Sequence, residues 1–125
     1  MALQSIQDLD VFRAAYGLSL EVHRASLGFP KIEQFGGLAD QMRRSTKSIC
    51  ALIAEGSGRQ RGSKVEFRRY VIMALGSADE AQLWCRYALD LGYIDEATFE
   101  RWQSGYVRVA KQLQMLANRL SSSEH

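Results

Sequence analysis

Proline and long apolar runs are nearly absent from this sequence, and both absences limit its architecture. Pro30 is the one proline among 125 residues, so long helices can run uninterrupted on either side of it. No stretch approaches the roughly 20 apolar residues that a membrane-spanning helix needs, and no apolar run follows a basic segment at the N-terminus. We therefore expect a cytoplasmic protein with long helices and no membrane contact.

Cysteine and histidine are also scarce. Cys50 and Cys85 have no second cysteine or histidine at metal-ligand spacing, so we expect them to be reduced and to act as small buried apolar groups. His23 stands alone in the first helical segment, and His125 is the last residue. Neither has partners for a metal site or a catalytic triad, so the sequence predicts no metal, no cofactor and no enzymatic activity.

The remaining composition is that of an ordinary globular protein, with 46% hydrophobic and 24% charged residues. A chain of 125 residues fits one domain that can bury a core without disulfide or metal support. We expect this single domain over residues 1–120, followed by a flexible C-terminal tail over residues 121–125.

Apolar residues recur at helical spacing in four segments, and no segment shows the sustained alternation of a strand. The predicted helices span about residues 8–27, 38–56, 63–91 and 95–120, and the glycine-rich residues 56–62 are expected to break the second. The four-and-three spacing favours near-parallel packing with left-handed crossing. The expected fold is therefore all-α, an antiparallel up-down four-helix bundle.

The third predicted helix has more apolar surface than one small bundle needs. Ser63 and Glu66 form a capping-box signature at its start. Two apolar stripes follow, the first mostly of small residues that allow close helix approach, and Ile72 and Leu75 lie outside both. Surplus apolar surface normally marks an interface, so we expect a homo-oligomer. The stripes are Phe67, Val71, Ala74, Ala78, Ala81, Cys85 and Ala88, and Tyr70, Met73, Ser77, Glu80, Trp84, Tyr87 and Leu91.

Positive charge is concentrated in residues 43–69. This segment holds eight of the sixteen Lys and Arg residues and two acids, so its net charge is eight minus two, or +6, in a chain of net charge +2. Such a field attracts RNA, DNA or acidic protein surfaces, although a solvated helix face is an equally good interpretation. The candidate nucleic-acid contacts are Arg43, Arg44, Lys47, Arg59, Arg61, Lys64, Arg68 and Arg69.

The loop within this segment is glycine-rich and basic, as phosphate-binding loops are. Residues 58–64 do not match G-x-x-x-x-G-K-[ST], however, and no strand precedes them. Two interpretations remain open. The loop is either a flexible turn that its arginines keep soluble, or a turn in which backbone N–H groups act with Arg59, Arg61 and Lys64 on a phosphate.

Glu55 and Glu80 are the two carboxylates whose positions predict partial burial. Glu80 falls on the second apolar stripe, and Glu55 follows apolar residues near the end of the second helix. Paired acids can perform general acid/base chemistry, but a buried carboxylate more often pairs with an arginine or caps a helix. We therefore expect a structural role, with Arg44 as a candidate partner.

Several short motifs occur in a recognisable order along the chain. They are Gln41-Met42-Arg43-Arg44, Ser48-Ile49, Ile53-Ala54-Glu55-Gly56, Gly58-Arg59, Glu66-Phe67 with Tyr70, Ala74-Leu75-Gly76-Ser77 with Glu80, and Leu91-Gly92-Tyr93-Ile94. Their order resembles the bacterial four-helix-bundle family that includes the proteins encoded by intervening sequences in 23S ribosomal RNA genes, and the resemblance extends from about Asp8 to Leu120. The sequence departs from the family at Cys50 and Leu52, where the family often has proline and asparagine, so a polar contact made by that asparagine would be absent here.

This resemblance implies an all-helical bundle that assembles as a ring, commonly of five subunits, without established enzymatic activity. Similar proteins include the accessory variability determinant of diversity-generating retroelements, a basic pentamer that works with a reverse transcriptase and its RNA. The family's basic positions match Arg43, Arg44 and Arg59, and its acidic positions match Glu55 and Glu80.

Two functional hypotheses follow from the sequence. The first is a non-enzymatic oligomer that binds nucleic acid, with RNA favoured over DNA, because a ring would repeat a weak basic patch and add its contacts by multivalency. The second is a protein-interaction scaffold whose basic surface docks an acidic partner or a polymerase-like or reverse-transcriptase-like enzyme. Binding of nucleic acid by the purified protein would support the first hypothesis. Capture of a specific protein that persists after nuclease treatment would support the second.

Overall fold

The structure, a computed structural model, describes residues 9–59 and 63–122 and is all-α, as the sequence predicts. Within these ranges there is no strand. Arg61 and residues 123–125 of the predicted tail lie outside the described part. The last helix ends at Ser122 and so includes the first two residues of the predicted tail. The elements are α1 (Asp10–Ser26), the short 3-10 helix η2 (Lys31–Glu33), α2 (Leu38–Arg59), α3 (Lys64–Asp90) and α4 (Glu96–Ser122).

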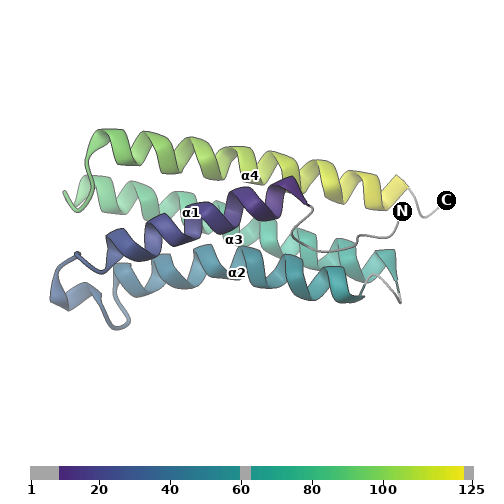
Figure 1. Ribbon diagram of the computed structural model, residues 1–125, viewed down its shortest axis with the longest axis horizontal. Helices are drawn as coiled ribbons and strands as arrows, with labels where there is room; N and C mark the ends of the chain where they lie inside the picture. Colours follow the sequence, from purple (N-terminus) through teal and green to yellow (C-terminus); the bar gives the residue numbers. More distant parts are fainter. Residues whose placement is uncertain (1–8, 60–62, 123–125) are drawn as a thin grey trace.

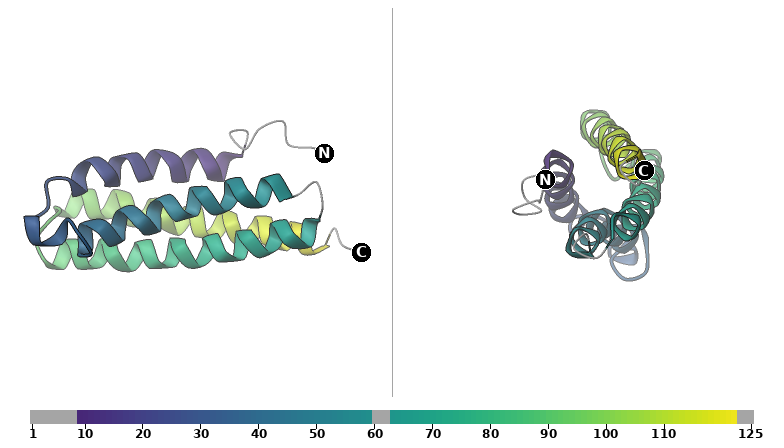
Figure 2. Two further views of the ribbon diagram at one scale, coloured as in Figure 1. Left: turned by 90° about the horizontal axis from the view of Figure 1, so that it is seen from below. Right: turned by 90° about the vertical axis from the view of Figure 1, so that its right-hand side faces the viewer.

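The four long helices lie side by side in one bundle (Figure 1). The α1–α2 and α3–α4 connections lie at one end of the molecule, and the end of α2 and the start of α3 lie at the other. Seen along the axis, the helices follow one another around the bundle in chain order (Figure 2). α3 packs extensively against both α2 and α4, whereas α1 packs against α2 and, less extensively, against α4.

The core consists of one apolar stripe from each long helix. The first predicted stripe of α3 is fully buried, and its alanines allow α2 and α4 to pack close to it. The largest fully buried side chains of this core include Trp102 and Tyr106 of α4 and Ile49 and Ile53 of α2. Burying each aliphatic or aromatic side chain of this kind contributes about 1.5–3 kcal/mol to folding.

Side-chain caps begin both α3 and α4, and the cap of α3 is the one that the sequence predicts at Ser63. The Oγ of Ser63 accepts a hydrogen bond from the backbone N–H of Glu66 at 3.1 Å. A carboxylate oxygen of Asp95 accepts one from the backbone N–H of Thr98 at 2.8 Å. Each cap satisfies an N–H group that the first helical turn leaves without a partner.

The prediction that the glycine-rich segment ends the second helix at Gly56 is wrong, because α2 continues to Arg59. A Cβ atom at Gly56 would lie 2.6 Å from the Cβ of Tyr70 and 3.0 Å from Cδ1 of Phe67. The glycine therefore lets α3 approach the α2 backbone. This packing outweighs the roughly 1 kcal/mol by which glycine disfavours a helix.

The two connections at the same end of the bundle are joined by Glu33. One of its carboxylate oxygens accepts a 2.7 Å hydrogen bond from the backbone N–H of Leu38, and the other accepts a 2.8 Å bond from the hydroxyl of Tyr93. The Tyr93 ring also packs on Phe29, with 5.1 Å between centroids. These contacts fix the α1–α2 connection against the α3–α4 connection.

Candidate nucleic-acid interface

The predicted basic residues fall into two groups at opposite ends of α2. We call Arg43, Arg44 and Lys47 the early α2 group. The hairpin group consists of Arg59 at the end of α2 and of Lys64, Arg68 and Arg69 in the first turns of α3. Lys47 and Arg59 are twelve residues apart on α2, which corresponds to about 18 Å at roughly 1.5 Å per helical residue. The cations of α2 and α3 that the structure describes therefore form two separate positive regions.

Arg43, predicted to contact a polyanion, is held in a network within the protein. Its Nη1 donates to the Oγ of Ser26 at 2.8 Å and to Oε1 of Gln34 at 3.2 Å, and its Nη2 donates to the backbone O of Gln34 at 2.9 Å. The Gln34 amide in turn donates to the carbonyls of Ser26 and Phe29. Arg43 thus joins the end of α1, the connection and α2.

The other two residues of the early α2 group face solvent. Arg44 has 74% of its side chain exposed and is 3.2 Å from Asp40, one helical turn away. Lys47 is exposed, and its Nζ lies 3.0 Å from Nδ1 of His23 on α1. An exposed ion pair of this kind contributes little stability, so both side chains are able to exchange their present contacts for a phosphate.

The hairpin group is partly engaged within the bundle. The Nε of Arg68 donates to the carbonyl of Ala117 on α4 at 3.0 Å, so Arg68 connects two helices. Arg69 is 3.1 Å from Glu66 and lies over the Tyr70 ring, 5.0 Å from its centroid. Lys64 is exposed at the start of α3. Arg59 is the last residue of α2, and the predicted contact Arg61 lies outside the described residues.

The expected pairing of Arg44 with Glu55 or Glu80 is wrong, because Arg44 pairs with Asp40 four residues earlier. Glu55 instead accepts a 3.1 Å hydrogen bond from the Tyr70 hydroxyl, which links α2 to α3. The expectation of burial also fails, since both glutamates are exposed. The second stripe of α3 faces away from the core along much of its length, so Glu80 lies in solvent.

A groove of about 400 Å³ runs along the outer seam between α1 and α2, beside the early α2 group. Tyr16 and Leu20 supply apolar surface, and Ser19 and Cys50 contribute further lining. His23 and Lys47 complete the set of six residues, none of which is acidic. The groove thus combines apolar walls with a positively charged boundary.

The cations around this groove act on His23. The Lys47 ammonium lowers the pKa of His23 from its ordinary 6.5, and burial, Arg43 and Arg24 lower it further. An ammonium group can only donate, so Nδ1 of the neutral imidazole accepts the hydrogen bond from Lys47. The positive charges of Lys47, Arg43 and Arg24 thus act together at His23.

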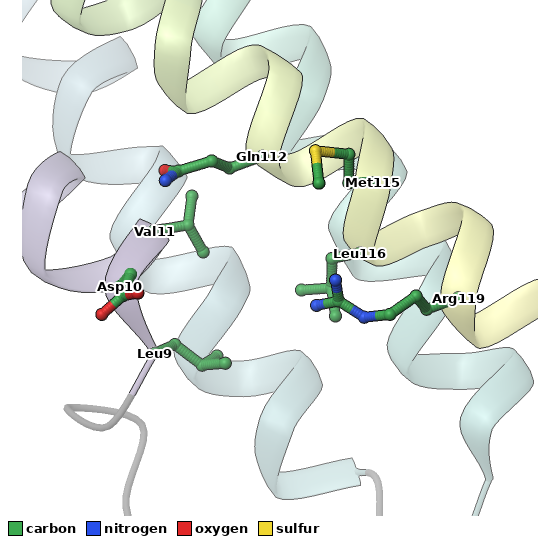
Figure 3. Close-up of a pocket in the computed structure, with 7 residues that line it drawn as sticks. All are labelled: Leu9, Asp10, Val11, Gln112, Met115, Leu116 and Arg119. Carbon is green, nitrogen blue, oxygen red and sulfur yellow. The ribbon is translucent and has the colours of Figure 1, made fainter.

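A second groove of about 320 Å³ lies where the start of α1 faces the last turns of α4 (Figure 3). Its lining combines the apolar side chains of Leu9, Val11 and Leu116 with one acid, Asp10, and one base, Arg119. Asp10 also pairs with Arg13. Because its charges balance, this groove has less electrostatic attraction for an anion than the α1–α2 groove.

Sequence reasoning did not identify Tyr16 and His23 as residues that line one groove. Tyr16 is 51% exposed and stacks on Phe12 at 5.9 Å between centroids. His23 was set aside as isolated, yet α1–α2 packing places it beside Lys47. No local pattern links residues 23 and 47, because their proximity depends on the register between two helices.

Candidate metal ligands are not clustered in the described residues, and both thiols have raised pKa values. Within residues 9–59 and 63–122 there is no group of three or more His, Cys, Asp or Glu side chains that could hold a metal ion. Burial raises the pKa of Cys50 to about 11 and that of Cys85 to about 12, which keeps both thiols protonated near neutral pH. No helix in the described part is long and apolar enough to cross a membrane.

Comparison with known proteins places this bundle in a family. A solved protein of unknown function from the S23 ribosomal protein family of Bacteroides thetaiotaomicron has the same fold, with a TM-score of 0.76 and 20% sequence identity over 86% of this chain and 97% of its own. No curated protein sequence matches this chain. Residues 7–115 match the family described as 23S rRNA-intervening sequence protein. The chain therefore belongs to the 23S rRNA-intervening sequence protein family.

Proposed function

We propose that this protein is a non-enzymatic nucleic-acid-binding protein, with RNA as the favoured ligand. The observation that carries the proposal is the positive charge around the α2–α3 connection. Residues 59–69 hold five cations and one acid, for a net charge of +4, at the point where α3 presents its N-terminal N–H groups. A helix N-terminus and adjacent cations both attract phosphate.

The early α2 group supplies a second positive region. Arg44 and Lys47 are exposed there, and Lys47, Arg43 and Arg24 act together on His23 of α1. Contacts to phosphates do not depend on base sequence and weaken strongly with salt. The proposal therefore predicts binding with little sequence preference and a steep dependence on ionic strength.

The test is fluorescence anisotropy with nuclease-treated protein, structured RNA, single-stranded RNA and duplex DNA across a salt series. Replacing Arg59 and Lys64 together with alanine should weaken binding and reduce the slope of log affinity against log salt by about two, or one per lost phosphate contact. Arg108 and Lys111, exposed on α4, provide a control with the same charge loss. Absence of binding at low salt would reject the proposal.

We also propose that this antiparallel up-down bundle assembles as a ring, in which α3 meets a second copy of the chain. The outward face of α3 carries several exposed large apolar side chains among charged ones. The family resemblance favours five subunits. The exposed large apolar residues are Val65, Ile72, Met73, Leu83 and Tyr87 of α3, and Leu91 directly after the helix.

Charge along α3 supports a second copy as the occupant of this face. Its first turns carry Lys64, Arg68 and Arg69 with Glu66, for a net charge of three minus one, or +2. Residues 79–90 carry three acids and one arginine, for a net charge of −2. Two copies shifted along α3 would thus align opposite charges beside the apolar contact.

Docking of a protein partner is the alternative function. Ile32 and Phe35 are 84% and 91% exposed on the α1–α2 connection, which Arg43 and Glu33 hold in place. Exposed apolar side chains on an ordered segment can act as binding anchors at little entropic cost. A pull-down should capture a specific acidic or polymerase-like protein even after nuclease treatment. Loss of this capture with Phe35→Ser would favour the docking function.

A further inference from the structure

The α1–α2 groove has a chemical composition that the proposed phosphate contacts do not require. A surface that recognised only the nucleic-acid backbone would need cations, but this groove is largely apolar and has a half-exposed tyrosine at its edge. Tyr16 lies on the same groove as Lys47 and His23. The arrangement places a flat aromatic ring beside a positively charged boundary.

An unstacked nucleotide matches both features. Its base is planar and stacks on aromatic rings with little regard to base identity, and its phosphate is attracted to adjacent cations. A volume of about 400 Å³ is within the range of small-ligand sites. We propose that the α1–α2 groove is a subsite for one unpaired nucleotide, with the base on Tyr16 and the phosphate at Lys47 and His23.

The surrounding contacts orient the cationic side of this subsite. Lys47 reaches across the seam to His23, so the two residues form one pair contributed by two helices. Arg24 and Arg43 add positive potential at His23, while the Arg43 guanidinium remains bonded to Ser26 and Gln34. Arg43 therefore contributes charge from a fixed position, whereas Lys47 is the cation able to turn toward a phosphate.

Phe12 extends the aromatic surface along α1. It lies one helical turn before Tyr16, with the two rings nearly parallel at 13°. This stacking limits the rotation of Tyr16 and holds one ring face in a defined orientation. A base bound on Tyr16 would consequently meet a preorganised surface, which reduces the ordering that binding requires.

This inference rests on the proposed function, and it specifies single strands. A base paired in a duplex cannot leave its stack to reach Tyr16 without unpairing. The expected ligand is therefore single-stranded RNA or an unpaired loop, while duplex nucleic acid binds through phosphate contacts to the basic groups without a base on Tyr16. A preference for single strands that depends on Tyr16 would distinguish the groove from the wider basic surface.

The experiment compares a fluorescein-labelled oligouridine with duplex RNA, using the full chain and its Tyr16→Ala and Tyr16→Phe variants. Tyr16→Ala should weaken oligouridine binding by roughly 5- to 100-fold, as loss of base–aromatic stacking does elsewhere, and should leave duplex binding unchanged. Tyr16→Phe, which retains the ring, should bind as the wild type does. Lys47→Ala should weaken oligouridine binding more than Lys111→Ala, a matched charge loss on α4.

Photo-crosslinking of a 4-thiouridine oligonucleotide to the unmodified protein provides a test without mutation. The crosslink should map to the α1 peptide that contains Tyr16. Equal oligouridine affinity in wild type and Tyr16→Ala, with no crosslink on α1, would overturn the nucleotide subsite while leaving salt-dependent binding by the basic groups intact. Failure of the wild type to bind any nucleic acid at low salt would instead reject the proposed function and the subsite together.

Discussion

Arg43 donates a hydrogen bond from Nη1 to the Oγ of Ser26 at 2.8 Å and so joins α2 to the last turn of α1. The same guanidinium binds the side chain and backbone of Gln34. A planar guanidinium can serve these acceptors together because its donors diverge in a fixed fork, a geometry that lysine lacks. The primary role of Arg43 in the free protein is therefore structural.

Arg43→Ala should lower the free energy of unfolding by about 1–3 kcal/mol, because it leaves partly buried acceptors on Ser26 and Gln34 without a donor. Urea denaturation measures this change. Arg43→Lys should recover only part of the loss. Arg44→Ala, which removes an exposed pair with Asp40, is the control and should change stability by less than about 0.5 kcal/mol. Equal effects of Arg43→Ala and Arg44→Ala would contradict the structural role.

Gly56→Ala should destabilise the protein by about 1–3 kcal/mol, because the new Cβ would overlap Tyr70 and Phe67 and push α3 away from α2. Gly76 provides the comparison. It lies inside α3, and a Cβ atom added there would meet no atom within 4 Å. Gly76→Ala should therefore raise the free energy of unfolding of the isolated chain by up to about 1 kcal/mol and raise its melting temperature. Melting curves that shift in the same direction for both variants would argue against this account.

The outer face of α3 can be tested by introducing charge. Ile72→Glu and Leu83→Glu should each convert the oligomer to a smaller species in light scattering, because a carboxylate would be buried without a partner in the proposed interface. Met115→Glu on α4 adds the same charge at a residue of similar exposure and should leave the mass unchanged. A wild type that is monomeric at all concentrations would remove the ring from consideration.

The pair formed by His23 and Lys47 makes a prediction about pH. Because the folded chain lowers the pKa of His23 below 6.5, the unfolded chain binds more protons between the two pKa values. The contribution of His23 to stability is therefore present above about pH 6.5 and declines as the pH falls through that value toward the folded pKa. In an NMR titration, Lys47→Ala should raise the pKa of His23, whereas Lys111→Ala should not.

The two thiols should react slowly while the protein is folded. Burial raises the pKa of Cys85 to about 12 and its side chain has no exposed surface; because the thiolate is the reactive form, Cys85 should be labelled by a thiol reagent only on unfolding. Cys50 borders the α1–α2 groove and is less buried, so it should react first. A bound oligouridine should slow the labelling of Cys50 by covering the groove that it borders.

The helices were predictable because their apolar spacing is a local property of the sequence. The Ser63 and Asp95 caps were predictable for the same reason, since a cap requires only a few consecutive residues. The end of α2 was not, because Gly56 is kept helical by contact with Tyr70, fourteen residues later. A single-sequence pattern carries no direct sign of such a contact.

The candidate site was only partly predictable. Charge identified the basic segment, but it could not separate Arg43, whose donors are used within the bundle, from Lys47, which faces solvent. The distinction depends on where Ser26 and Gln34 lie in space. Tyr16 and Lys47 likewise line one groove because α1 packs against α2 in a particular register.

The contact between Tyr93 and Glu33 has a consequence for local unfolding. It joins residues sixty positions apart at the end of the bundle that contains both the α1–α2 and the α3–α4 connections. Asp10, at the opposite end of α1, lies beside the α1–α4 groove and pairs with Arg13 of its own helix. Local unfolding of α1 away from the bundle should therefore begin at Asp10 and proceed toward Ser26. Amide hydrogens along α1 would then exchange in a gradient, slowest beside the fixed end.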